Sequence, residues 1–451
     1  MWRATWIVML LIGEWLVFRL SVARCHWPSP SSPVDDQLPQ RVLLIADPQV
    51  TDAYSYDRTG ALLWATEFYS DLYMRRSYHH LTNSKQPEQI VLLGDLMDGG
   101  REWDEQGWRT QLKRFYRIFN KQITIPTLYM SGNHDIGIRD GIKLDVFQRF
   151  QTQFGPTSSI HSLAYNHTMV ILDTVALTST NPETKLSIQH DALAVMNEMG
   201  RATNSYVENG KSGERVLLTH VPLYRPEQTS CGPLRVQSRP YIYQGYGYQY
   251  QNLMEEDVSR IILQHIQPDL IFSGDDHDFC EVTHAYHAAQ QQRLASEYTV
   301  PTFSMSQGVR QPGYMLLQAT EDKLVPQLCW LPDQLGIFIK YGLLAGLTLI
   351  TFFVRCLSQL SESGSLPWSD RKKKMKRMKQ EDEENMMDSF VVVGGTDLAL
   401  SSTTSTAATA LSSPSSSSAA KLPSPIKSCL HDIKDVVIVA LPFYIACTLF
   451  L

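Results

Sequence analysis

The sequence predicts an α/β protein in which short buried strands alternate with helices and carry polar residues at their carboxyl ends. Five apolar runs, RVLLIA, QIVLL, PTLYMS, RVLLT and LIFS, are each followed by Asp, Asn or His or by a Gly beside one. Apolar runs of this length, bounded by Gly or polar residues, are typical of strands buried on both faces. Between them lie stretches with helical periodicity, and helices are expected at 62–80, 107–120 and 186–201. Residues 41–332 therefore form successive βα units.

The polar residues that follow these runs form five motifs. Because the carboxyl ends of strands in an open α/β sheet border one crevice, the motifs are expected to converge there. Carboxylate, amide and imidazole donors in one place suit two divalent ions about 3.5–4 Å apart, which is a phosphoesterase arrangement. The motifs are Asp47-Pro48-Gln49, Gly94-Asp95-Leu96-Met97-Asp98, Gly132-Asn133-His134-Asp135, His220 and Gly274-Asp275-Asp276-His277.

Individual residues of this set have distinct expected roles. Asp47 and Asp95 would hold the first ion, and Asp95 is placed to bridge to the second. Asn133 supplies a neutral amide oxygen, which leaves room for an anionic phosphate beside two cations. His220 and His277 would complete the two coordination spheres. Taken alone, an aspartate such as Asp47 after a strand is usually a turn or capping residue, so the prediction depends on the whole set.

His134 is predicted to be the general acid. Its neighbour in the motif is a ligand, so His134 is better placed to face substrate and to protonate the leaving oxygen. Asp98 is expected to hold the imidazole as a cation, and the alternative is a solvated loop carboxylate. Arg225, Arg235 and Arg310 are candidates for gripping a phosphate or glycan, with a surface salt bridge as the alternative for each.

An apolar segment at residues 4–23 begins the chain, but it contains Glu14 and Arg19. An ionisable residue inside a membrane segment costs about 2.5–3.5 kcal/mol, so it usually has a partner or a function. Residues 1–25 are therefore expected to be an uncleaved transmembrane anchor. The alternative is a signal peptide, because Ser21-Val22-Ala23 resembles a cleavage site.

A second apolar segment, residues 335–356, is long enough to span a bilayer as a transmembrane helix. Arg355 and the basic cluster at 371–377 are cytoplasmic by the positive-inside rule, which places residues 41–332 on the lumenal side. The sequon Asn166-His167-Thr168 would then lie where N-glycosylation occurs. The two signals thus give the same topology, a multi-pass glycoprotein with a lumenal domain.

The remaining segments are short or compositionally biased. Residues 26–40 form a polar linker rich in Pro and Ser. Residues 358–432 are charged and then rich in Ser, Thr and Ala, so they are expected to be a disordered cytoplasmic segment. Residues 436–451 are an apolar C-terminal membrane segment with Pro442 inside, either a short third span or an inserted tail.

Charge and cysteine content narrow the function further. The net charge of −6 gives no basic field, so nucleic acid is not expected as a partner. The seven cysteines include no CxxC pair. Cys231, Cys280 and Cys329 would share the lumenal compartment, which permits one disulfide among them without saying which.

The order of the motifs resembles the calcineurin-like metallophosphoesterase superfamily over about residues 41–315, with its pattern D-x-H, GD-x-x-D, GNH-D/E, a lone His and GH-x-H. The resemblance implies a four-layer β-sandwich flanked by helices. Gln49 stands where the first His of the pattern is expected, and Asp275 stands for the first His of the last motif. Because an amide is a weaker donor than imidazole, Gln49 is expected to be a weak ligand or to act from outside the coordination sphere. Two oxygen-for-nitrogen replacements favour harder ions such as Mn²⁺.

The resemblance also divides the ligands between the two ions. One ion would be held by Asp47, Asp95 and His277, and the other by Asp95, Asn133, His220 and Asp275.

Three local sequences are similar to one branch of this superfamily, the membrane-anchored phosphoesterases that trim ethanolamine phosphate from glycosylphosphatidylinositol (GPI) anchors. They are SGDDHDFC at 273–280, PLYR at 222–225 with CGPLR at 231–235, and GYGYQYQN at 245–252. The resemblance implies Mn²⁺-dependent phosphodiester hydrolysis on an anchor mannose in the endoplasmic reticulum or early Golgi. Its substrate would be a GPI lipid or a GPI-anchored protein, and the reaction would support anchor remodelling and ER-to-Golgi transport.

Two other functions stay open at this stage. A different hydrolase of the superfamily, such as a phosphoprotein phosphatase or nucleotidase, is disfavoured by the lumenal topology. A non-catalytic cargo-trafficking factor with a degraded metal site would explain Gln49 and Asp275. Against that reading, Asp95, His134 and His220 are all in place with the rest of the motif residues.

Overall fold

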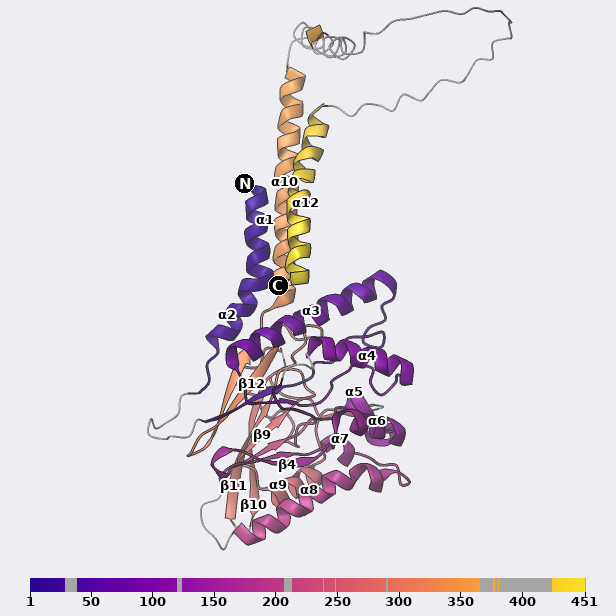
Figure 1. Cartoon of the computed structure of the whole chain (residues 1–451), viewed down its shortest axis with the longest axis vertical. Coiled ribbons are helices and arrows are strands. Elements are labelled where there is room, and N and C mark those ends of the chain that lie inside the picture. The colour runs from indigo at the N-terminus through magenta and orange to yellow at the C-terminus, as the bar shows by residue number, and fades with distance from the viewer. Residues whose placement is uncertain are drawn as a thin grey trace, which may run out of the picture. The chain divides into compact units, whose positions relative to one another are not determined.

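The protein is described here from a computed structural model of the whole chain (Figure 1). Most of the predicted linker, of the basic cluster at 371–377 and of the segment 358–432 lies outside the described residues. The structure describes residues 1–28, 39–119, 124–206, 213–237, 239–247, 249–288, 291–365, 376–377, 380 and 424–450.

The first sheet has five strands in the order β13-β12-β1-β2-β3. Strands β1, β2 and β3 are parallel, whereas β12 is antiparallel to both of its neighbours. Ile45 of β1 pairs with Leu92 of β2, so the two strands end level and the loops carrying Asp47 and Asp95 start side by side. The strands are β1 (Gln40–Ile45), β2 (Gln89–Leu92), β3 (Thr127–Tyr129), β12 (Gly313–Ala319) and β13 (Leu324–Trp330).

The second sheet has six strands in the order β10-β11-β9-β6-β5-β4. Leu218 of β6 pairs in parallel with Phe272 of β9, which brings the loops of His220 and Asp275 to one edge. The strands are β4 (Ser159–Ser162), β5 (Thr168–Ile171), β6 (Arg215–Leu218), β9 (Leu270–Ser273), β10 (Cys280–Ala288) and β11 (Gln291–Thr299). The sequence GYGYQYQN at 245–252 contains a separate two-stranded sheet of β7 (Tyr246–Gly247) and β8 (Tyr250–Gln251).

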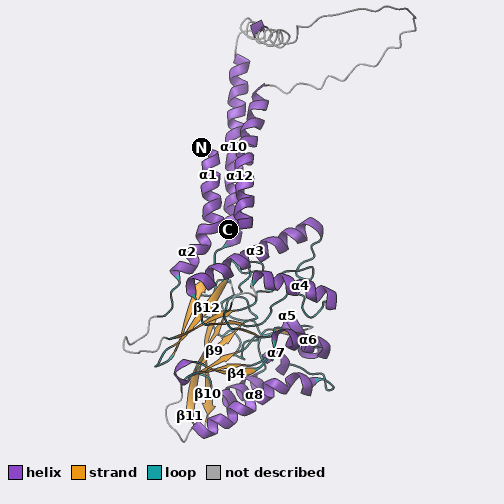
Figure 2. Cartoon of the chain, viewed as in Figure 1, coloured by secondary structure: helices purple, strands orange, loops and turns teal. Residues whose placement is uncertain are grey.

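Side chains of both sheets share one buried cluster, in which Val42 and Leu44 of β1 join Leu218 of β6 and Phe272 of β9. Successive side chains of a strand point to opposite faces, so Leu43 faces the other way and packs in the cluster that includes the helices. Burial of both faces explains why these strands are continuous apolar runs. Helices cover the outer faces, with α3 and α4 at one side of the strands and α8 and α9 at the other (Figures 1 and 2).

The three predicted helices are present as α3 (Gly60–Lys85), α4 (Glu105–Ile118) and α8 (Lys185–Tyr206). The other helices of this region were not predicted, because they are short or have a mixed sequence. They are α5 (Asn133–Ile136), α6 (Leu144–Phe154), α7 (Thr174–Leu177) and α9 (Glu256–Ile266), with 3₁₀ turns at Arg139–Gly141 and Ala164–Asn166.

Among the described residues, two helical runs are long and apolar enough to cross a membrane, Trp2–Arg24 and Gln334–Gln359. The first comprises α1 (Trp2–Leu11), a π-helical turn at Ile12–Leu16 and α2 (Val17–Arg24). The second belongs to α10 (Gln334–Ser365). The predicted C-terminal segment is the end of a longer helix, α12 (Ser424–Phe450), which includes Pro442.

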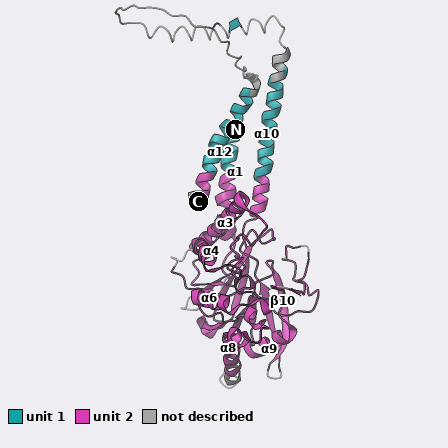
Figure 3. Cartoon of the chain, turned by 90° about the vertical axis from the view of Figure 1, so that its right-hand side faces the viewer, with its two compact units in different colours: residues 1–8, 341–444 teal, residues 9–340, 445–451 magenta. Residues whose placement is uncertain are grey.

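The chain divides into two compact units (Figure 3). The larger comprises residues 9–340 and 445–451, and the smaller comprises residues 1–8 and 341–444. Within the smaller unit, α10 and α12 are linked by an ion pair of 3.6 Å between Arg355 and Asp432.

Two disulfides lie in the larger unit, Cys231–Cys280 and Cys25–Cys329. The first joins two of the three cysteines expected in one compartment. The second was not predicted, because Cys25 had been assigned to the membrane anchor. It forms because α2 packs beside β13, which carries Cys329.

Candidate metal centre

The motifs converge because three of them contain glycines that allow close approach. Gly94 has φ +97°, and a Cβ there would lie 2.5 Å from His220 Nδ1. A Cβ on Gly132 would overlap Asp95 Oδ1. Gly94 before Asp95 and Gly132 before Asn133 are therefore steric requirements of the site, because a larger residue would push its side chains apart.

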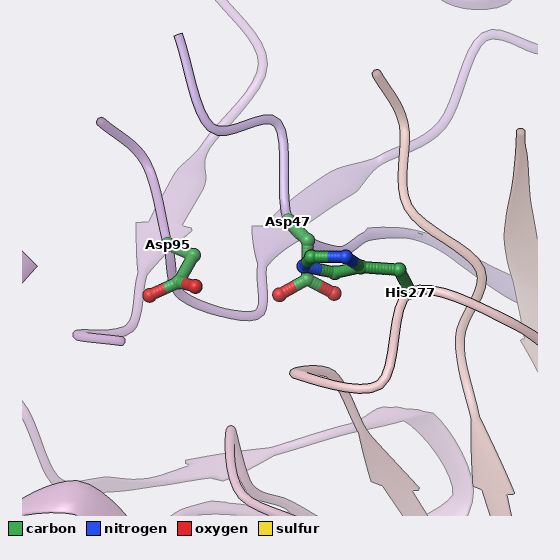
Figure 4. A group of neighbouring side chains, drawn as sticks. All are labelled: Asp47, Asp95 and His277. Atoms are coloured by element: carbon green, nitrogen blue, oxygen red, sulfur yellow. The ribbon is translucent and has the colours of Figure 1, made fainter. Parts of the chain in front are cut away.

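Asp47, Asp95 and His277 form one candidate metal group, whose ligand atoms all lie within 4.8 Å of one another (Figure 4). His277 Nε2 is buried and has no hydrogen-bond partner among the described residues. Burial lowers the pKa of His277 to about 4, so its ring is neutral at neutral pH. A neutral imidazole with a free, buried nitrogen beside two carboxylates fits a divalent cation.

A second group of donors surrounds His220 Nε2. Because His220 Nδ1 lies 2.8 Å from the carbonyl oxygen of Leu93, which only accepts, Nδ1 carries a hydrogen and Nε2 is the nitrogen that could bind a cation. Nε2 lies 3.2 Å from Asn133 Oδ1, 3.3 Å from Asp95 Oδ1 and 3.7 Å from Asp275 Oδ1. The residues assigned to the second ion therefore lie around His220 Nε2, and Asp95 belongs to both groups.

The electrostatics of the cluster also favour cations. Burial raises the pKa of Asp47 well above its ordinary value and that of Asp275 to about 7. Burial would lower the pKa of His220, but the carboxylate of Asp95 raises it well above its ordinary value. Protons thus supply the positive charge that these carboxylates need, and divalent ions would take their place. The residues present fit a divalent-cation centre.

His134 and Asp98 form a pair at the margin of the cluster. His134 Nδ1 lies 2.8 Å from Asp98 Oδ1, and the side chain of His134 is 27% exposed. Burial alone would lower the pKa of His134, but Asp95 and Asp98 raise it to about 9. Asp98 is 8% exposed, so it is not the solvated loop carboxylate of the alternative reading. The imidazole is held as a cation beside the metal ligands.

Gln49 contacts Asp95, which belongs to both groups of candidate metal-binding residues. Its Nε2 donates to Asp95 Oδ2 at 2.6 Å, and its backbone N–H donates to the carbonyl oxygen of Asp95 at 2.8 Å. Of the two expected roles, this geometry corresponds to the one outside the coordination sphere. Gln49 orients Asp95, the carboxylate that both groups share.

The three candidate substrate arginines are each paired with a carboxylate. Arg225 is buried and lies 2.9 Å from Glu297, and Arg235 lies 2.5 Å from Asp276. Arg310 is exposed and lies 2.8 Å from Asp333. All three therefore form salt bridges, of which only that of Arg310 is the surface salt bridge of the alternative, and nothing in their geometry supports contact with substrate.

Two aspartates that the sequence did not single out support the site. Asp135 accepts hydrogen bonds from the backbone N–H groups of Leu96 at 3.0 Å and Gly132 at 2.9 Å, so it ties two ligand loops together. Asp52 accepts from Trp103 Nε1 at 2.8 Å beside the loop of Asp98. Asp135 belongs to a recognised motif, but no sequence signal distinguishes Asp52.

A two-sheet α/β sandwich with carboxylate, amide and imidazole donors gathered at the ends of its strands defines a metal-dependent phosphoesterase. Residues 40–279 match the sequence pattern of the calcineurin-like phosphoesterase family. The chain belongs to this family.

The similarity of the chain to its relatives extends beyond residues 40–279. The chain is 34% identical over 372 residues to Cell division control protein 1 of Saccharomyces cerevisiae, covering 77% of this chain and 72% of that protein. It is 25% identical over 369 residues to Metallophosphoesterase 1 of Mus musculus, covering 77% and 87%. A dimetal phosphatase from Danio rerio, a solved structure, aligns with TM-score 0.38 and 13% identity over 64% of this chain and 96% of that one.

Proposed function

We propose that the protein is a Mn²⁺-dependent phosphodiesterase that removes ethanolamine phosphate from a mannose of GPI anchors. The observation that carries the proposal is the shared carboxylate Asp95, which connects one donor group around His277 to a second around His220. One shared carboxylate between two cation sites is the arrangement used for in-line displacement at phosphorus.

When bound, two divalent ions would neutralise the phosphate oxygens and lower the pKa of a bound water from its value in bulk solvent towards about 7. The protein's own residues supply the rest. His134 donates a proton from Nε2 to the departing oxygen, because its Nδ1 is engaged by Asp98. Asn133 offers an uncharged oxygen, which limits repulsion of the phosphate. Gln49 holds Asp95 in orientation.

The substrate class is proposed from the membrane segments and the similar sequences together. Among the described residues, two helical runs could cross a membrane. A phosphodiester linked to lipid would lie in the leaflet that faces the catalytic domain. Asn166 is exposed in the turn between β4 and β5, where a glycan could be attached. We place the catalytic domain in the lumen of the endoplasmic reticulum or early Golgi, in a multi-pass protein that supports export of GPI-anchored proteins.

The test uses the full-length protein in detergent with Mn²⁺ and a GPI glycan that bears ethanolamine phosphate. Mass spectrometry should show loss of one ethanolamine phosphate, and no loss with Asp95→Asn. Hydrolysis of soluble nucleotides without any action on the GPI glycan would favour a nucleotidase instead. In cells, export of GPI-anchored proteins rescued by Asp95→Asn would favour the non-catalytic trafficking role.

A further inference from the structure

Helix α3 carries a large apolar surface on its first two turns. Leu62 is 61% exposed and Trp64 is 63% exposed. Trp64 stacks on Phe68 with ring centroids 5.3 Å apart, so the two aromatic rings form one surface. Positions 64, 68, 75 and 79 recur at helical spacing, and Arg75 and His79 continue this face as exposed polar groups.

The C-terminal half of the same helix binds the N-terminal apolar run. Arg76 of α3 lies 2.6 Å from Glu14, which is buried in the π-helical turn between α1 and α2. Arg76 also donates to the carbonyl oxygen of Cys447 at 2.6 Å. An ionisable group in the middle of an apolar run is thus satisfied by α3, which fixes the position of the run against this helix.

The start of the second apolar run contacts the middle of α3. Tyr69 and Phe338 of α10 meet edge to face with ring centroids 5.6 Å apart. Tyr69 also meets Phe68 at 5.2 Å, so the aromatic surface continues from Trp64 to the first turns of α10. Both contacts lie within the larger compact unit. Helix α3 therefore contacts both candidate spans through residues of theirs that belong to the larger unit.

The other sides of α3 are occupied. Tyr73 and Met74 face the core, and Glu67 and Asp71 pair with Arg114 of α4 at 3.2 and 2.8 Å. Leu62 and Trp64 are two positions apart and lie at opposite edges of one broad apolar face of α3, which also includes the partly exposed Ala65, Phe68 and Tyr69.

We propose that α3 lies on the membrane surface and that Leu62 and Trp64 contact the lipid acyl boundary. Tryptophan prefers this boundary because its ring is apolar and its N–H is polar. A helix with an apolar face and flanking Arg and His is suited to the interfacial plane. The occupant is lipid rather than a partner protein, because the aromatic surface continues from Trp64 to Phe338 at the start of one candidate span and α3 also binds Glu14 of the other.

The placement has a consequence for catalysis. The loop that precedes α3 begins at the ligand Asp47 and holds Asp52, which bonds to the loop of Asp98. A helix fixed on the bilayer would thus hold the metal centre at a constant height above one leaflet. This inference rests on the proposed function only in requiring that the two apolar runs cross a membrane.

The test places a nitroxide label at Trp64→Cys in the full chain, with Cys356, Cys429 and Cys447 replaced by Ser. The protein is reconstituted in nanodiscs of palmitoyl-oleoyl phosphatidylcholine, and collision rates with oxygen and with a nickel chelate are measured. Leu343→Cys, inside the second span, serves as the lipid reference. Leu186→Cys on α8 is the aqueous control, because Leu186 is 78% exposed.

A label at position 64 should collide more often with oxygen than with the nickel chelate, as a label at position 343 should. A label at position 186 should collide more often with the nickel chelate. A label at Trp64 that behaves like Leu186 while Leu343 is in lipid would overturn the inference and leave the proposed function standing. If the Leu343 label is also aqueous, the membrane assignment itself is wrong and both fail. If the unlabelled protein does not hydrolyse the GPI glycan while the Trp64 label still lies in lipid, the proposed function alone would be overturned.

A second measurement connects the surface to activity. Leu62→Ser with Trp64→Ser should lower the rate on a lipid-linked phosphodiester in the same nanodiscs by at least about fivefold, because interfacial binding scales with buried apolar area. Hydrolysis of soluble bis(p-nitrophenyl) phosphate should be unchanged, and Leu186→Ser should change neither rate. Equal loss on both substrates would indicate a folding role and would count against the proposal.

Discussion

Glu14 and Arg76 are 62 residues apart in the chain and form a buried ion pair, with Oε2 and Nη1 separated by 2.6 Å. Neither side chain exceeds 3% exposure. Glu14 was, with Arg19, one of the two residues that made the N-terminal segment unusual as a membrane helix, and Arg76 is the partner that the sequence could not identify. The pair makes the apolar run part of the catalytic unit instead of a flexible tether.

The pair predicts a non-additive effect on stability. Glu14→Leu or Arg76→Met alone should lower the free energy of unfolding by about 3–5 kcal/mol, because either removes the counter-charge of a buried ionised group. The double variant should be close to the wild type, since buried pairs replaced by apolar groups are often neutral. Urea unfolding in detergent micelles measures the cycle. Additive losses in the double variant would mean that the two groups are not coupled.

The same contact predicts that the N-terminal helix is retained in the mature protein. Cleavage after Ala23 would remove Glu14 and leave Arg76 buried, with the Cys447 carbonyl oxygen as its remaining hydrogen-bond partner among the described residues. The intact mass of the purified protein should therefore include residues 1–23. A mature chain that begins at Arg24 would show that the segment is a signal peptide and that Arg76 has another partner.

Local and tertiary information explain which features were predictable. The strands, three long helices and the residues of the candidate metal centre were visible because each depends on a few adjacent residues. The partners of Arg225, Arg235 and Arg310 were not, because a carboxylate can come from any part of the chain. The disulfide of Cys25 was missed for the same reason, since it depends on the packing of α2 beside β13.

Glu297 predicts a change of stability in acid. It lies 2.9 Å from Arg225 and 2.5 Å from His284, and it accepts from Ser273 at 2.7 Å, just before the loop of Asp275. Burial would raise the pKa of Glu297, but Arg225 and His284 lower it from 4.5 to about 2. Because the folded-state pKa is depressed, this stabilisation is complete above pH 4.5 and is lost as pH falls towards about 2.

Glu297→Gln should therefore be less stable than the wild type at neutral pH and should lose less stability between pH 4.5 and 2. Urea unfolding at several pH values provides the comparison, with Glu183→Gln as a control because Glu183 is exposed. Parallel pH profiles for the wild type and Glu297→Gln would contradict the assignment.

Metal binding should stabilise the fold, because the donor groups come from separate loops. Mn²⁺ at about 100 times its dissociation constant should add about 2.7 kcal/mol, and chelation should remove it. His277→Ala should weaken this stabilisation, since Nε2 is the free buried donor of the first group. Calorimetric titration with Mn²⁺ gives the number of ions. Unchanged Mn²⁺ binding in His277→Ala would exclude His277 as a ligand.

The general-acid role of His134 predicts a dependence on the leaving group. An alkyl or sugar oxygen needs a proton as it departs, so His134→Ala should slow such substrates by about 10²–10⁴-fold. A p-nitrophenolate leaves without a proton, so the same variant should retain most of its rate on bis(p-nitrophenyl) phosphate. Asp98→Asn should show the same pattern more weakly, because Asp98 holds the imidazole at 2.8 Å without reaching the substrate. Mn²⁺ stabilisation measured on each variant separates this effect from loss of metal. Equal losses with both leaving groups would mean that His134 binds the phosphate and does not deliver the proton.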